Sequence, residues 1–168
     1  LRTYRELSRS LSRTGPGNVE IVVDDEIADL PPDRSVWLLG WNNRFFPSLL
    51  SATAQYDVTL DSAALRLERT TLPRSDHAFV LTARHPLNPD LALLWIAADN
   101  LDAIPGLGRK LPPYHKYSYL AFAGREPSNV AKGRWPTTGG PPTVFLDSDT
   151  GRPIPSGAFP RRDPPSAP

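Results

Sequence analysis

The sequence predicts an α/β domain with an open, mostly parallel three-layer sheet of the Rossmann-like or flavodoxin-like kind, followed by a proline-rich irregular tail. Three observations support this prediction. Apolar runs short enough to be strands alternate with segments whose apolar residues recur at helical spacing. The runs 35–40 and 91–98 are apolar without alternation, which is typical of strands buried on both faces of a parallel sheet. The chain also contains 20 prolines, which disfavour long helices.

The N-terminal segment predicts a helix and then a strand. Tyr4, Leu7 and Leu11 lie three or four positions apart, which is typical of a short amphipathic helix. A Thr-Gly-Pro-Gly stretch ends this pattern, so residues 1–17 are interpreted as a helix and linker from a preceding part. Residues 19–24 are rich in β-branched side chains and predict a strand.

A strand–turn–helix unit follows. The apolar run 35–40 ends in glycine and predicts a buried strand. Residues 42–55 carry apolar side chains at helical spacing, with Pro47 in the first turn, where its missing N–H costs least. Residues 58–70 alternate only in part and predict a hairpin or an extended excursion.

The middle of the chain repeats this alternation. Residues 76–83 predict a strand, and the two X-Pro steps within 84–90 predict a turn after it. The most apolar run, 91–98, predicts a central strand. Residues 101–111 predict a helix that Asp99 or Asn100 caps, and 117–123 predict a last strand.

The pattern fades beyond Gly124. Residues 144–146 predict a short edge strand, so the α/β domain is assigned to 18–146. Residues 147–168 are rich in proline, glycine, serine and arginine, and we expect a flexible tail there. The chain begins with Leu1 and contains no methionine, which favours a fragment of a longer protein.

Composition narrows the function classes. The net charge is +1 and no concentrated basic face is evident, so we expect no nucleic-acid partner. No cysteine is present, which excludes disulfides, thiolate zinc sites and cysteine nucleophiles. No apolar run approaches the roughly 20 residues of a membrane span. We therefore expect a soluble domain, and we leave its compartment open, with export of the parent as one alternative.

Motifs of catalysis and cofactor binding are missing from the sequence. The turn after Gly40 has one glycine, whereas a dinucleotide-binding turn needs G-x-G-x-x-G. No phosphate-binding G-x-x-x-x-G-K-[ST], no G-x-S-x-G and no H-E-x-x-H occurs. Asp24, Asp25 and Glu26 could bind a cation, but a solvated turn is favoured because alternating oxygen ligands are absent. We predict no catalytic residue, no metal ligand and no cofactor in this chain.

Polar residues after the strand 76–83 form the first candidate ligand site. Arg84, His85 and Asn88 follow its carboxyl end, where open α/β sheets bind ligands. The favoured alternative is structural: Asn88 makes an Asx-type turn and Arg84 pairs with a nearby acid.

Two later segments also carry polar residues, and only the second of them contributes to the candidate ligand site. Residues 109–117 interleave basic and aromatic side chains, as single-stranded nucleic-acid binders do, although cations favoured at a helix C-terminus explain them more simply. Residues 129–136 predict an ordered loop anchored by Trp135. Asn129 and Lys132 from this loop complete the set of candidate ligand-binding residues.

Four segments carry a resemblance to a known family: 84–89, 109–114, 116–120 and 129–136. Their succession resembles a region downstream of the catalytic part in bacterial M1-family (gluzincin) metallopeptidase-like proteins. It is also similar to accessory α/β domains of some bacterial serine peptidases of the α/β-hydrolase type. The sequence departs from the M1-associated motif at Pro113 and His115, where the motif has histidine and glycine.

The resemblance implies an accessory domain. M1 enzymes hold zinc on an H-E-x-x-H helix with a downstream glutamate, and bind the substrate amine with a Gly-Ala-Met-Glu-Asn-like segment. None of these motifs occurs in this chain. Zinc and hydrolysis would therefore belong to the missing catalytic part of the parent, and that part is the implied partner of this domain.

Two functional hypotheses follow. The first is a non-catalytic accessory domain of a peptidase-like protein, whose parent is an M1-type zinc aminopeptidase. The second is a small-ligand-binding α/β module that uses the loops at the carboxyl ends of its strands.

Overall fold

The computed structural model describes residues 2–13, 19–56, 58–67 and 70–135. Two sheets account for most of this part of the chain. The larger sheet has five strands in the spatial order β1 (Val36–Leu39), β6 (Asn88–Ala98), β5 (His77–His85), β7 (Tyr119–Ala123) and β8 (Ser128–Gly133). The smaller sheet is antiparallel and consists of β2 (Val58–Leu60), β3 (Ala64–Leu67) and β4 (Thr70–Pro73).

Short helices connect and cover these strands. The α-helices are α1 (Arg2–Ser12), α2 (Phe46–Thr53) and α3 (Ile104–Lys110). Four 3-10 turns complete the described elements: η1 (Asp24–Glu26), η2 (Arg74–Asp76), η3 (Leu101–Ala103) and η4 (Pro112–Tyr114). None of the helices in the described part of the chain is long and apolar enough to cross a membrane.

The predicted parallel sheet is wrong. Of the four pairings in the larger sheet, the pairing of β1 with β6 is parallel and the other three are antiparallel. The predicted turn 84–90 is in fact the tip of a hairpin, in which His85 pairs with Asn88. A two-residue connection can join antiparallel strands only, because a parallel crossover needs a dozen residues or more.

The uniform apolar runs that suggested parallel strands have another cause. Both faces of the larger sheet are covered at β5, so successive residues of this strand enter different cores. Phe79 and Leu81 pack on one side, and Ala78 and Val80 pack on the other. An antiparallel strand buried on both faces therefore shows the same composition as a parallel one. The predicted buried strand 35–40 is less enclosed, since Trp37 of β1 is exposed.

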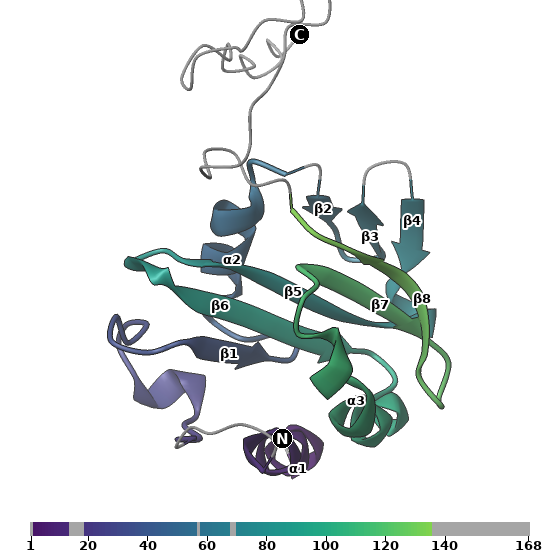
Figure 1. Cartoon of the computed structure of the whole chain (residues 1–168), viewed down its shortest axis with the longest axis horizontal. Coiled ribbons are helices and arrows are strands. Elements are labelled where there is room, and N and C mark those ends of the chain that lie inside the picture. Colours follow the sequence, from purple (N-terminus) through teal and green to yellow (C-terminus); the bar gives the residue numbers. More distant parts are fainter. Residues whose placement is uncertain (1, 14–18, 57, 68–69, 136–168) are drawn as a thin grey trace, which may run out of the picture. The chain divides into compact units, whose positions relative to one another are not determined.

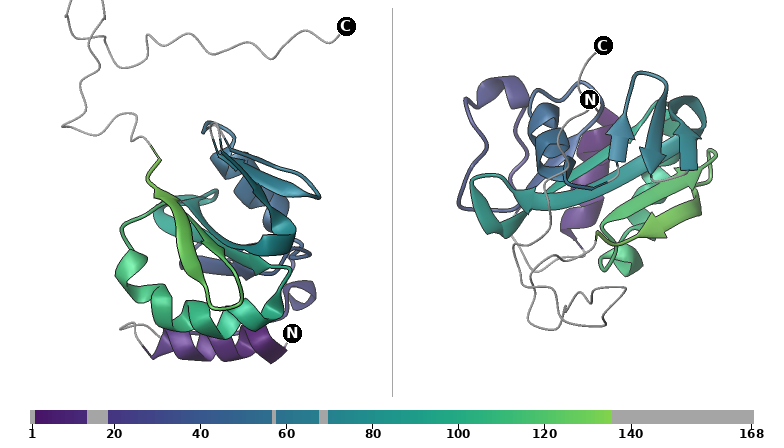
Figure 2. Two further views of the ribbon diagram at one scale, coloured as in Figure 1. Left: turned by 90° about the vertical axis from the view of Figure 1, so that its right-hand side faces the viewer. Right: turned by 90° about the horizontal axis from the view of Figure 1, so that it is seen from above.

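The two faces of the larger sheet carry different partners (Figures 1 and 2). Helices α1 and α3 cover one face, where Leu7 and Leu107 pack with Ile96 and Phe122. Gly108 allows the two helices to approach, since a Cβ there would lie 3.1 Å from the Ser10 hydroxyl oxygen. The predicted helices over 1–13 and 101–111 are confirmed.

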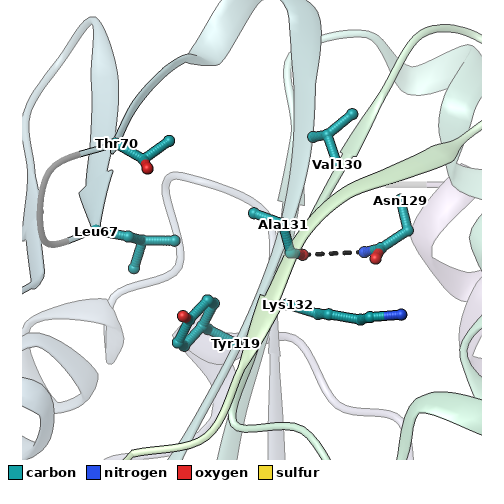
Figure 3. A pocket seen from close by; sticks show the side chains of 7 residues that line it. All are labelled: Leu67, Thr70, Tyr119, Asn129, Val130, Ala131 and Lys132. Carbon is teal, nitrogen blue, oxygen red and sulfur yellow. Dashed lines mark hydrogen bonds between the residues drawn. The ribbon is translucent and has the colours of Figure 1, made fainter.

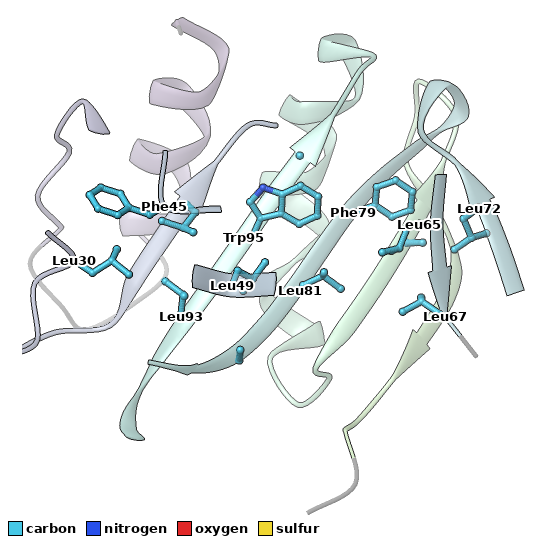
Figure 4. Packing of buried hydrophobic residues seen from close by; sticks show 14 residues of the cluster. Leu30, Phe45, Leu49, Leu65, Leu67, Leu72, Phe79, Leu81, Leu93 and Trp95 are labelled. Carbon is cyan, nitrogen blue, oxygen red and sulfur yellow. The ribbon is translucent and has the colours of Figure 1, made fainter. Parts of the chain in front are cut away.

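The opposite face is covered by α2 and the smaller sheet. Figure 4 shows Trp95 and Leu81 of the larger sheet packed beside Leu49 of α2 and Leu65 of β3. The predicted hairpin over 58–70 is confirmed by the pairing of β2 with β3. The described part of the chain thus forms three layers, although one outer layer contains strands as well as a helix.

The predictions for three other parts of the chain are not confirmed. The strand predicted over 19–24 is wrong: residues 19–23 have no regular structure, and Val19, Ile21 and Val22 are exposed. The ordered loop predicted over 129–136 is instead the strand β8 followed by its anchor, Trp135. The predicted edge strand 144–146 and the tail 147–168 lie outside the described residues.

Candidate functional site

The first predicted cluster lies at the tip of the β5–β6 hairpin, where its polar groups bind one another's backbone. The Arg84 guanidinium donates a hydrogen bond to the Pro89 carbonyl, at 2.7 Å. The His85 side chain is 1% exposed, and its Nδ1 accepts a hydrogen bond from the Leu87 N–H at 3.2 Å. These contacts stabilise the turn.

Asn88 has the structural role that the sequence suggested as the alternative. Its Oδ1 accepts the Asp90 N–H at 3.2 Å, as in an Asx turn, and its Nδ2 donates to the Pro32 carbonyl at 3.0 Å. The structure thus brings Arg84, His85 and Asn88 together, and each of them binds a backbone group of the fold. The buried Nε2 of His85 has no hydrogen-bond partner among the described residues.

Asn129 and Lys132 lie elsewhere, on β8. Asn129 Nδ2 donates to the carbonyls of Ala121 and Ala131, at 3.1 and 2.9 Å. The ladder is irregular at this point, because Ala121 pairs with Ala131 while Phe122 pairs with Asn129. Val130 is therefore a bulge residue, and the Asn129 amide bonds to the carbonyls beside it.

The outer edge of β8 carries no partner strand among the described residues, since β8 is the terminal strand of its sheet. On the side of β7 that faces β5, the Thr82 N–H donates a hydrogen bond to the Ser118 carbonyl. Because backbone groups alternate in direction along a strand, the N–H and C=O groups of Tyr119 and Ala121 face β8. Ala131 and Gly133 pair with these two residues, so the N–H and C=O of Lys132 face outward. Such free backbone groups can accept a further strand.

A hollow of about 440 Å³ lies beside this edge. Both sheets contribute to its lining, which consists of Leu67, Thr70, Tyr119, Asn129, Val130, Ala131 and Lys132. Figure 3 shows Tyr119 and Leu67 on one side of β8, with Lys132 extending away from Leu67 and Thr70. The hollow is within the size range of ligand pockets, and it includes two of the five predicted ligand-binding residues.

Aromatic rings and ammonium groups gather on the α3 side of β8. The Lys132 Nζ lies 5.5 Å from the Tyr117 ring centroid and 5.8 Å from that of Tyr114. The Lys116 Nζ lies 5.6 Å from the same Tyr117 ring. Tyr114 in turn packs edge-on against Phe122, with the ring centroids 5.6 Å apart. The predicted basic and aromatic segment 109–117 thus meets β8 in space.

Other polar groups are engaged within the fold. A hollow of about 200 Å³ borders Asp76, His77 and Asn100, but the Asn100 Oδ1 accepts the Asp102 N–H at 3.1 Å. Arg74 pairs with Asp99 at 2.8 Å and lies 3.8 Å above the Trp41 ring. Within the described ranges, no group of three or more histidine or acidic side chains is placed to hold a metal ion.

Comparison of the chain with family models, with curated proteins and with solved structures finds no match.

Sequence reasoning missed Tyr119, Leu67 and Val130 as lining residues of the hollow. Residues 128–133 give no periodic signal for β8, because the exposed Val130 and the half-buried Asn129 reverse the usual relation between hydropathy and burial in a strand. The contribution of Leu67 and Thr70 could not be found, because it depends on how the smaller sheet packs against the larger one.

Proposed function

We propose that this chain is a non-catalytic binding domain that holds an extended polypeptide segment along the outer edge of β8. The observation that supports this proposal is the outer edge of β8, which has no partner strand among the described residues and lies beside a hollow lined by both sheets. A bound strand would form main-chain hydrogen bonds with the outward groups of β8, each contributing about 1 kcal/mol.

The hollow suits alternate side chains of such a segment. Leu67 and Tyr119 offer apolar surface, and Thr70 offers a polar group. In strand addition, affinity comes from the backbone ladder and selectivity comes from pockets that accept every second side chain. A small ligand is less favoured, because Arg84, His85 and Asn88 bind the backbone of their own hairpin.

We further propose that the segment belongs to the catalytic part of a peptidase-like parent, of the M1 zinc aminopeptidase type. The support is the resemblance of residues 84–89, 109–114, 116–120 and 129–136, together with the absence of an H-E-x-x-H motif from this sequence. In this proposal the zinc and the hydrolytic step belong to the parent, and this domain packs on the catalytic part or helps to gate its substrates.

Titration with a short strand-forming peptide tests the binding surface. The probe is a capped heptapeptide of alternating threonine and valine, added to the ¹⁵N-labelled chain at up to about 1 mM, the range of a −4 kcal/mol interaction. We expect amide shift changes in β8 and at Leu67 and Thr70, with little change in α1 on the opposite layer.

The fully N-methylated peptide is the matched control, since it keeps every side chain and lacks every backbone donor. We expect it to cause no shifts. Equal binding of the methylated peptide, or shifts confined to residues away from β8, would show that strand addition is not the function of this edge.

A further inference from the structure

Two ammonium groups share one aromatic ring beside the β8 edge. Lys116 and Lys132 both place Nζ within 5.6 Å of the Tyr117 ring centroid. The ring faces attract each cation, but the two like charges repel one another. Both side chains are exposed, and Arg134 adds a third exposed cation two positions after Lys132.

The local charge is not balanced by acids. Residues 103–146 contain six basic side chains and one acidic side chain, Glu126, although the whole chain has a net charge of only +1. Two of these cations are paired: Glu126 lies 3.9 Å from Arg109, and Asp102, just before this segment, lies 3.4 Å from Arg125. The other four of the six basic side chains have no carboxylate within ion-pair distance in the described part of the chain: Lys110, Lys116, Lys132 and Arg134.

We propose that the segment held at β8 is acidic and places carboxylates against Lys116 and Lys132. This inference rests on the proposed function and names the class of its ligand. Side chains on one face of a strand repeat about every 7 Å, so a Glu-x-Glu pattern would present two carboxylates to this face. Carboxylates there would relieve the repulsion between the ammonium groups and steer the segment to the edge.

A peptide fits these features better than a single-stranded nucleic acid. Base stacking needs an open aromatic face, whereas Tyr114 packs edge-on against Phe122 and has Lys132 near its ring. The outward backbone groups of Lys132 also favour a ligand with its own amide ladder.

Three capped heptapeptides that differ only in charge test the proposal. One is the neutral threonine–valine peptide. In the second, two successive threonines, which lie two positions apart, are replaced by glutamate to give Glu-x-Glu. In the third, the same two threonines are replaced by lysine. We expect the glutamate peptide to bind about tenfold more tightly than the neutral one at low salt, with most of this advantage lost at 0.5 M NaCl.

Glutamine substitutions identify the cations involved. We expect Lys132→Gln and Lys116→Gln each to weaken glutamate-peptide binding by about two- to fivefold. Lys116→Gln, at a residue outside the lining of the hollow, should leave neutral-peptide binding unchanged. Lys110→Gln is the matched control, because Lys110 is an exposed lysine at the end of α3 and is not one of the two lysines that lie over the Tyr117 ring. We expect it to have no effect on either peptide.

The outcomes separate the two proposals. Equal affinities for the three peptides would overturn the acidic-ligand inference and leave strand addition supported. Failure of all three to bind at β8 would overturn both proposals. Tighter binding of a 15-residue oligothymidine than of the glutamate peptide would overturn the acidic peptide as the ligand.

Discussion

The indole Nε1 of Trp135 donates a hydrogen bond of 2.6 Å to the carbonyl oxygen of Thr82, which lies in β5. The Trp135 ring also stacks on Tyr56, with the centroids 4.7 Å apart and an angle of 9° between the planes. One side chain therefore links the end of β8 to the larger sheet and to the segment that leads into the smaller sheet.

Trp135→Phe should lower the free energy of unfolding by about 1–2 kcal/mol, because it leaves the Thr82 carbonyl without this donor and reduces the stacked area. Urea unfolding followed by far-UV circular dichroism measures the change. Trp37→Phe is the control, since Trp37 is 44% exposed, and we expect a loss below about 0.5 kcal/mol. Equal losses for the two variants would contradict the anchoring role.

Gly133→Ala should destabilise the protein by about 1–3 kcal/mol, since an added Cβ would overlap the ring of Tyr119 on the neighbouring strand. The same substitution in a Tyr119→Leu background should cost less than half as much, because the overlapping ring atoms are then gone. A double-mutant cycle from unfolding curves gives both values. A cost independent of residue 119 would mean that another contact restricts Gly133.

The Nδ1 of His85 should carry no proton, which leaves Nε2 as the nitrogen that bears the ring hydrogen. Its Nδ1 accepts the Leu87 N–H, so that nitrogen bears no hydrogen, and the buried Nε2 has no partner among the described residues. Long-range ¹H–¹⁵N correlation spectra identify the tautomer directly. A proton on Nδ1 would contradict the hydrogen bond to Leu87.

His85→Ala should lower the free energy of unfolding by about 2–4 kcal/mol, because it opens a cavity and leaves the Leu87 N–H without its acceptor. His115→Ala provides the comparison, since His115 is exposed. Unfolding curves for the two variants should differ by more than 1 kcal/mol. Similar curves would show that the hairpin tip tolerates the loss of the buried ring.

Ionisation of the Tyr4 phenol should make the free energy of unfolding depend on pH in the alkaline range. Burial raises the pKa of the Tyr4 phenol; the hydrogen bond from the Ala98 N–H opposes this rise, and the Asp99 carboxylate adds to it. A raised pKa in the folded state means that this stabilisation is present below about pH 10, the unfolded value, and is lost as pH rises through the folded value.

Tyr4→Phe should therefore cost about 1 kcal/mol at pH 7, where the hydrogen bond to Ala98 is lost. The difference between wild type and variant should shrink as the pH rises above 10. Urea unfolding at a series of pH values measures both effects. A difference that stays constant from pH 7 to 11 would argue against the buried phenol as the titrating group.

Helices whose ends are set by neighbouring residues could be predicted from the sequence, whereas the pairing of the strands was harder to predict. The helix that begins after Asn100 was found because its cap is local: the Asn100 side chain accepts the Asp102 N–H. Strand direction at the β5–β6 connection was misjudged, although the short interval between the two apolar runs already argued for a hairpin. Apolar strands are ambiguous, because burial on both faces does not depend on strand direction.

The candidate site was predictable only in part. Asn129 and Lys132 were singled out from a distinctive sequence, and both border the hollow beside β8. Nothing local could predict that Lys116 and Lys132 approach the same ring, because that proximity depends on the pairing of β7 with β8. Long-range pairing is the information that a single sequence carries least directly.

The parallel pairing of β1 with β6 has a consequence for the order of folding. The β5–β6 hairpin closes through a two-residue turn. The pairing of β1 with β6 instead brings Val36 next to Leu93, which lies far away in the sequence. Loop closure over so long an interval is slow and entropically costly, so β1 should dock late and detach early. We expect the amides of β1 to exchange with solvent well before those of β5.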